Sequence, residues 1–94
     1  MNDAQLPARL HFNDSVRLRI GPDRGFLFDQ KTGRVYSVNA SGALAAARIQ
    51  AGDPSRAVIA AVTQEFDVDQ TAAERDFTRF VTQLIDEGLG EADG

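Results

Sequence analysis

The chain has 94 residues, of which 43% are hydrophobic and 26% are charged, a composition typical of a globular protein rather than a disordered one. This length suits one small domain spanning residues 1–94, in which we expect order over about residues 9–89 and flexible termini. The absence of cysteine excludes disulfides, thiolate metal sites and cysteine nucleophiles. The net charge of −4 repels phosphate backbones, so the composition counts against nucleic-acid binding.

The N-terminal segment does not resemble a signal peptide. Met1–Arg9 lacks the long apolar core of a signal peptide, and no apolar run approaches the length of a membrane span. We therefore expect a soluble cytoplasmic protein without membrane contact. Small and polar residues with one proline predict that Met1–Ala8 frays.

Three segments in the first half of the chain have strand patterns. Val16–Ile20 alternates between apolar and basic residues, as a strand with one wet face does. Gly21–Gly25 combines glycine, proline and aspartate and predicts a hairpin loop. Phe26–Asp29 and Arg34–Val38 predict two more strands, joined by a tight turn over Gln30–Gly33. Together they predict a three-stranded antiparallel meander.

The pattern then becomes helical. Asn39 and Ser41 are alternative N-caps for an alanine-rich helix that ends at Gly52. Asp53 supplies the next N-cap and Pro54 the first position of a second helix. The third and longest helix is expected over Asp69–Leu89. The chain is thus predicted to be an α+β domain, a three-stranded antiparallel sheet followed by three helices.

The apolar stripe of the third helix makes it the predicted cover of the sheet. Phe77, Phe80 and Leu84 recur at helical spacing. We expect them to pack on inward residues of the strands: Leu18, Leu27 and either the set Val35/Ser37 or the set Tyr36/Val38. The sequence leaves open which of these two sets faces inward.

Catalytic chemistry finds little support in the sequence. His11 is the only histidine, which excludes a histidine-rich metal site. The carboxylates fall at helix ends or on solvated faces, where capping and solubility explain them. Gly21–Gly25 lacks the spacing of a phosphate-binding loop. We therefore predict no enzyme activity, no metal and no cofactor.

A winged-helix DNA-binding regulator is the alternative function. Two helices joined by a short turn plus a hairpin outline that motif, and Arg17, Arg19 and Arg34 would form a basic strand face. However, the third helix sets five carboxylates against only Arg75 and Arg79, which would place net negative charge in the groove of the DNA.

Peptide binding by strand addition is the other reading. Arg34–Val38 contains no proline and one charge, so as an edge strand it would be open to pairing with an extended chain. The third helix would form the groove's other wall, with Phe80 supplying apolar area and Asp76, Gln83 and Glu87 supplying polar contacts. The same edge would also allow a homodimer. Equally, the strand residues could simply be sheet core.

Several short motifs carry a resemblance to a known family. They are Phe28-Asp29, Thr32–Tyr36, Val38-Asn39, Ser41–Leu44, Phe66–Asp69, then Asp76, Phe80, Leu84 and Gly88-Leu89. In order and spacing, over about Leu10–Leu89, the chain resembles the PqqD-like family, recognition domains for precursors of ribosomally made, modified peptides. It departs from the common pattern at Ala46, where a bulkier residue is usual, and before Gly52, where an acidic residue is usual.

The resemblance implies a winged-helix-like fold without catalysis, acting as a peptide chaperone. In the family, the leader of a precursor peptide lies as an added strand between the third strand and the third helix. A partner enzyme, often a radical SAM protein in pyrroloquinoline quinone assembly, then modifies the presented core. The positions implied here are Val35, Tyr36, Ser37 and Val38 on the strand, and Asp76, Arg79, Phe80 and Gln83 on the helix.

Overall fold

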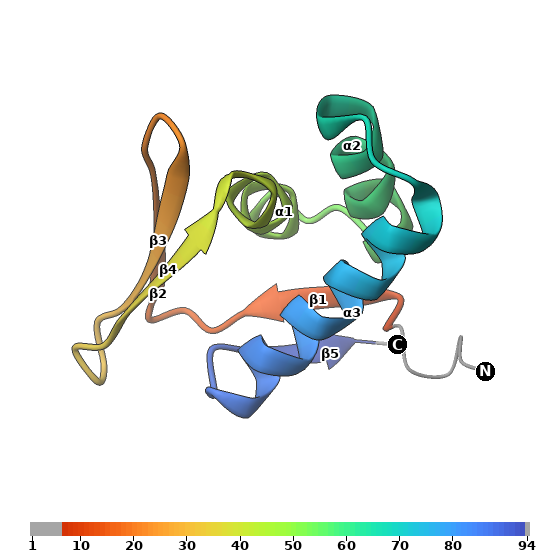
Figure 1. Cartoon of the computed structure of the whole chain (residues 1–94). Helices are drawn as coiled ribbons and strands as arrows, with labels where there is room; N and C mark the ends of the chain where they lie inside the picture. The colour runs from red at the N-terminus through yellow and green to blue at the C-terminus, as the bar shows by residue number, and fades with distance from the viewer. Residues whose placement is uncertain (1–6, 94) are drawn as a thin grey trace.

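The computed structural model describes residues 7–93 and shows an α+β fold (Figure 1). Most of the segment expected to fray, residues 1–6, lies outside the described part. The elements are β1 (Arg9–Phe12), β2 (Val16–Ile20), β3 (Arg24–Asp29), β4 (Val35–Asn39), α1 (Ala40–Gln50), α2 (Ser55–Phe66), α3 (Gln70–Asp86) and β5 (Gly90–Asp93). The predicted three-stranded antiparallel sheet and three helices are confirmed, and β1 and β5 add a two-stranded sheet.

The main sheet has the order β2-β3-β4, so β3 is central and β4 is an edge. Asp29 stabilises the turn into β4, because its Oδ1 accepts hydrogen bonds from the Ser15 hydroxyl (2.9 Å) and the Lys31 amide (3.0 Å). On β4, Tyr36 and Val38 are half-buried and pack against the core, whereas the alternate residues are exposed. The question that the sequence left open is therefore answered: Tyr36 and Val38 face inward.

The helix that covers the sheet is α1, not α3 as the sequence predicted. Helix α1 packs on β3 and β4, while α3 packs on α2 and β5 (Figure 1). Small side chains bring α1 and the sheet together: a Cβ added at Gly25 would lie 2.9 Å from the Cβ of Ala43. The stripe of α3 instead enters the common core through Phe77, Val81 and Leu84.

The helix starts agree with the sequence at two of three places. The side chain of Asn39 caps α1 by accepting from the Gly42 amide (2.9 Å), and Asp69 caps α3. For α2 the prediction is wrong by one residue, because Pro54 is the N-cap and no side chain caps the helix. Asp53 is paired instead with Arg48, at 3.4 Å. None of the helices in residues 7–93 is long and apolar enough to cross a membrane.

The C-terminal residues form a strand, β5, that the sequence pattern did not predict. Helix α3 ends at Asp86, and the chain turns at Gly88, whose φ is +74°. Strand β5 then pairs antiparallel with β1. Gly90 permits this contact, since a Cβ there would lie 2.8 Å from the carbonyl oxygen of His11. The pairing joins the two ends of the sequence, which a local pattern does not reveal.

Candidate functional site

The free edge of β4 is the first component of the site. The Asp29 amide donates to the Arg34 carbonyl (2.9 Å), and the register pairs Leu27 with Tyr36. Hydrogen-bonded pairs alternate in an antiparallel ladder, so the backbone N–H and C=O groups of Val35 and Ser37 point away from β3. Within residues 7–93, no strand pairs with this side of β4. The edge therefore offers two amides and two carbonyls to an extended chain.

One flank of α3 is the second component. Asp76, Arg79, Phe80 and Gln83 all line a pocket of about 380 Å³, together with Val38 at the end of β4. All four helix positions expected from the sequence therefore lie around one space. Phe80 is half-buried and packs against the core, whereas the three polar side chains are exposed.

The pocket also contains residues that sequence reasoning did not assign to it. Three groups complete its lining: Asn39, Ser41, Gly42 and Ala45 from β4 and α1; Ile59 and Val62 from α2; and Val68, Ala73 and Phe77 from the α2–α3 corner and α3. The Asn39 cap was visible in the sequence as a helix start, but its place beside α3 was not. With Ile59 and Phe77 buried at its base and charged groups at its rim, the pocket suits an apolar side chain on a polar backbone.

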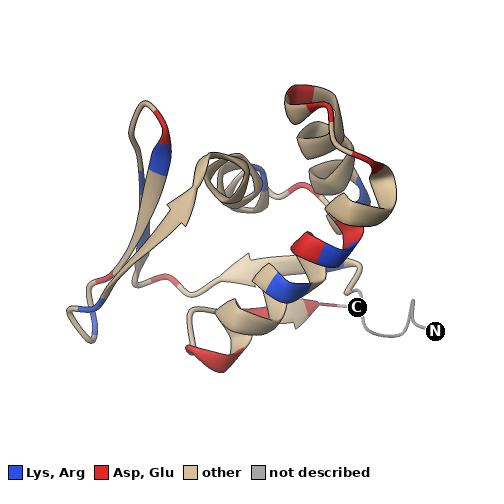
Figure 2. Ribbon diagram, in the orientation of Figure 1, with Lys and Arg blue, Asp and Glu red and all other residues tan. Residues whose placement is uncertain are grey.

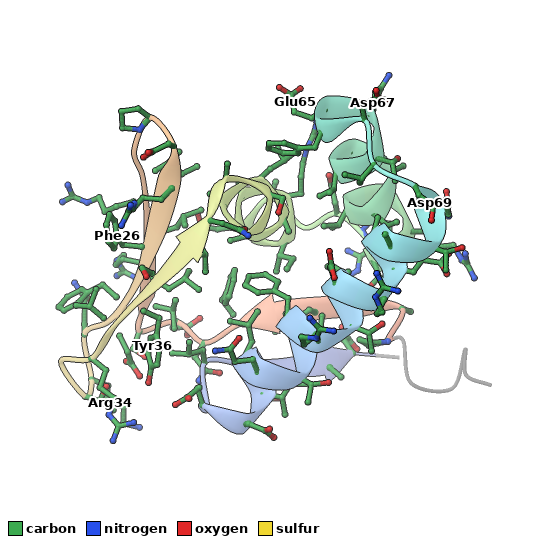
Figure 3. The ribbon with its side chains drawn as sticks, viewed as in Figure 1. Phe26, Arg34, Tyr36, Glu65, Asp67 and Asp69 are labelled. Atoms are coloured by element: carbon green, nitrogen blue, oxygen red, sulfur yellow. The ribbon has the colours of Figure 1, made fainter. Side chains whose placement is uncertain are left out.

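Contacts at Glu87 join the two walls at the other end of β4. The Tyr36 hydroxyl donates to Glu87 Oε1 (3.3 Å), and a guanidinium nitrogen of Arg34 lies 3.8 Å from the same oxygen. Hydrogen bonding with Tyr36, together with the nearby Glu87 carboxylate, raises the pKa of Arg34 above its ordinary value. Figure 3 shows Arg34 and Tyr36 at this end of the strand. These solvent-exposed contacts lie between β4 and the C-terminal end of α3.

The eight residues expected from the sequence fall into three groups. Five line the pocket: Val38, Asp76, Arg79, Phe80 and Gln83. Tyr36 faces the same side of the sheet and contacts the end of α3. The side chains of Val35 and Ser37 point to the opposite face of the sheet, so these two residues contribute only backbone groups to the edge.

Within residues 7–93, no cluster of three His, Cys, Asp or Glu could hold a metal ion.

A family model and two solved structures match this chain. The model of coenzyme PQQ synthesis protein D (PqqD) matches residues 24–89. The structure of TbiB1 in complex with the TbiA(beta) leader peptide is 24% identical over 89% of this chain and 98% of that chain, with a TM-score of 0.79. The structure of lasso peptide synthetase B1 complexed with the leader peptide is 26% identical over 89% and 99%, with a TM-score of 0.76. No curated protein matches the chain.

Proposed function

The chain belongs to the PqqD family, and we propose that it is a peptide chaperone that binds the leader segment of a ribosomally synthesised precursor. The leader adds a strand to β4, and the chain presents the precursor to a modifying enzyme. The observation that carries the proposal is the unpaired edge of β4 beside the pocket on α3. The proposal assigns no catalytic step to this chain.

The β4 edge would supply register and part of the affinity. Val35 and Ser37 offer four outward backbone groups, and each hydrogen bond to a peptide contributes about 0.5–1.5 kcal/mol net. Because every peptide has a backbone, these hydrogen bonds do not discriminate between leader sequences.

Selectivity would come from the pocket between β4, α1 and α3. In an added strand, alternate side chains of the peptide point to the same side as Tyr36 and Val38, which is the side where the pocket lies. A large apolar leader side chain would fill the space over Ile59 and Phe77. Asp76 and Arg79 at the rim would select polar or charged neighbours of that side chain.

The relatives support a peptide ligand rather than DNA. Both similar structures are complexes with leader peptides. The DNA-binding alternative is not favoured, because α3 exposes Asp76, Asp86 and Glu87 and the net charge is −4. Figure 2 shows the carboxylates spread over α3 and the α2–α3 corner.

The enzyme that acts on the captured precursor is the second partner in this proposal. A bound leader keeps its core segment near that enzyme and raises the effective concentration of the substrate. A radical SAM enzyme of pyrroloquinoline quinone assembly would fit this role. We place the encounter in the cytoplasm, where a ribosomal precursor is made. Without peptide, the same β4 edge would allow pairing with a second copy of the chain.

Binding of a fluorescently labelled leader tests the proposal. The probe is the N-terminal segment of any short peptide encoded beside this chain's gene, its binding is followed by fluorescence anisotropy, and labelled duplex DNA is the control. We expect saturable binding of the leader and none of the duplex at physiological salt. Binding of the duplex without binding of the leader would refute the proposal.

A further inference from the structure

The face of the main sheet that α1 does not cover is open to solvent. Helix α1 packs on the side of Gly25 and Leu27, which are both buried. The alternate residues of β3, Phe26 and Phe28, point to the other side and are 37% and 36% exposed. In Figure 3, Phe26 lies on the side of the sheet away from α1. No helix in residues 7–93 packs over these rings.

The strand register places these rings in two rows. One row runs Arg17–Phe28–Val35 and the other Arg19–Phe26–Ser37 across β2, β3 and β4. We call these six residues the outer sheet face. Its centre, Phe26 and Phe28, is apolar, and Val35, which is 59% exposed, extends the apolar area to β4 beside the polar Ser37. Contiguous exposed apolar side chains rimmed by polar residues are a feature of interaction surfaces.

The charge around the outer sheet face is opposite in sign to that of the molecule. Residues 16–39 carry five of the ten Lys and Arg but only two of the fourteen Asp and Glu; of these five basic residues, Arg34 lies on the inward side beside Glu87, and Arg17 and Arg19 lie on the outer sheet face. Of the two acidic residues, Asp29 is buried, and Asp23 in the β2–β3 loop lies 3.8 Å from Arg24. Figure 2 shows basic residues along the strands of the sheet and on the helices, and acidic residues on α3, at helix ends and in loops. A complementary surface would be apolar at its centre and acidic beside it.

The outer sheet face borders the proposed peptide site. Val35 and Ser37 present their side chains on this face and their unpaired backbone groups at the β4 edge. A peptide added at that edge would extend the sheet by one strand, and half of its side chains would join the outer face. A partner bound there would contact both the chain and the captured peptide.

We propose that the outer sheet face docks the enzyme that acts on the captured peptide, through a surface of that enzyme with an apolar centre flanked by Asp and Glu side chains. This inference rests on the proposed function and adds to it the surface and chemistry of the second partner. Because the peptide completes the outer face, the loaded chain binds the enzyme more tightly than the empty chain. Aromatic and arginine side chains on a sheet would also suit single-stranded RNA, but the net charge of −4 disfavours that ligand.

Two double variants test the docking surface. Arg17→Glu/Arg19→Glu reverses its charge, and Phe26→Ser/Phe28→Ser removes its apolar centre. The matched controls are Arg75→Glu and Ile85→Ser, which alter exposed residues of α3 outside the pocket lining. The probe is a purified modifying enzyme encoded beside this chain, and its affinity is measured by biolayer interferometry for empty and leader-loaded chain.

We expect each double variant to weaken enzyme binding at least tenfold, while leader affinity and both controls stay within twofold of the parent chain. Raising the salt concentration should weaken the parent complex, since charge pairing contributes to it. Unchanged enzyme affinity in the arginine double variant would overturn the proposal. Both arginines are exposed, and the variant loses only the hydrogen bonds from Arg17 to the Asp14 and Val16 carbonyls, so it should fold.

Binding of a labelled ten-nucleotide uridine RNA tests whether the outer sheet face holds single-stranded RNA instead of the enzyme. RNA binding at physiological salt that both double variants abolish would overturn the docking proposal in favour of nucleic acid. Enzyme binding that depends on the outer sheet face, in a chain that binds no leader, would support the docking surface and refute the peptide site. The failures of the two proposals are therefore distinguishable.

Discussion

Phe80 connects the apolar stripe of α3 with the pocket. It is half-buried against the core and lines the pocket with Asp76, Arg79 and Gln83. An aromatic ring in such a position supplies large contact area to a ligand and loses little conformational entropy on binding. Among the proposed peptide-contacting residues, it is the one whose loss should matter most for affinity.

We predict that Phe80→Asp weakens leader binding by about 30-fold or more, since removal of a central aromatic contact costs about 2 kcal/mol or more. The measurement is a calorimetric titration with the leader peptide. The matched control is Ile85→Asp, which places the same charge on the exposed face of α3 outside the pocket lining. Equal affinities for the two folded variants would remove the pocket from the binding site.

Ser37 tests the strand edge separately from the pocket. Its amide points away from β3, so proline there removes no hydrogen bond of the sheet. We expect Ser37→Pro to weaken leader binding about tenfold, because one backbone bond is lost and the proline ring obstructs the peptide. Ser37→Ala should bind as the parent chain does. A leader affinity unaffected by proline would mean that the peptide does not pair with β4.

Asp29 gives the turn before β4 a dependence on pH. The Ser15 hydroxyl, followed by the Lys31 amide, lowers the pKa of the Asp29 carboxyl below its ordinary value. A lowered folded-state pKa stabilises the fold above the unfolded-state pKa of about 3.9, and this contribution is lost as the pH falls through the folded value.

Ser15→Ala should therefore raise the pKa of Asp29 and weaken the pH dependence of unfolding below about pH 4. Carboxyl ¹³C shifts measured across an acid titration report the first effect, and urea unfolding at several pH values reports the second. Thr71→Ala, which removes an exposed hydroxyl from the first turn of α3, is the control. An unchanged Asp29 titration in Ser15→Ala would contradict the assignment.

At the scale of elements, the contact between α1 and β3 positions the β4 edge. The close approach at Gly25 leaves no room for a methyl group beside Ala43. We predict that Gly25→Ala lowers the free energy of unfolding by about 1–3 kcal/mol, as overpacking does. Urea denaturation measures it. Gly21→Ala should have a smaller effect, since its nearest neighbour would lie 3.4 Å away; equal losses would show that the contact is not tight.

The features that the sequence could predict depend on local spacing along the chain. The strand and helix patterns of periods 2 and 3.6 depend on local spacing, so the six elements of the sheet and helices were predictable. The grouping of Asp76, Arg79, Phe80 and Gln83 was predictable for the same reason, because they share one flank of a helix.

Non-local packing was not predictable from these patterns. The hydrophobic stripe of α3 is stronger than that of α1, yet the alanine-rich α1 covers the sheet because only small side chains permit the approach at Gly25. The pairing of β5 with β1 and the part of the pocket supplied by Ile59 on α2 likewise depend on contacts between distant segments.

For the whole molecule, leader binding should raise stability. A ligand that binds only the folded chain adds about 2.7 kcal/mol at one hundred times its Kd, which corresponds to a rise in Tm of about 10 °C or more for a domain of this size. Differential scanning fluorimetry with increasing leader concentration measures it. A scrambled leader is the control, and a Tm independent of leader concentration would contradict specific binding.

A ¹⁵N-HSQC titration of the chain, with the leader segment of any short peptide encoded beside it, tests the proposed peptide site residue by residue. We expect shifts concentrated at the β4 edge, at Val35 and Ser37, and around the pocket, at Val38 and Phe80. Amides on α3 outside the pocket, such as that of Ile85, should move little. If saturating leader shifts no amide of β4 or the pocket, the leader does not bind at this site.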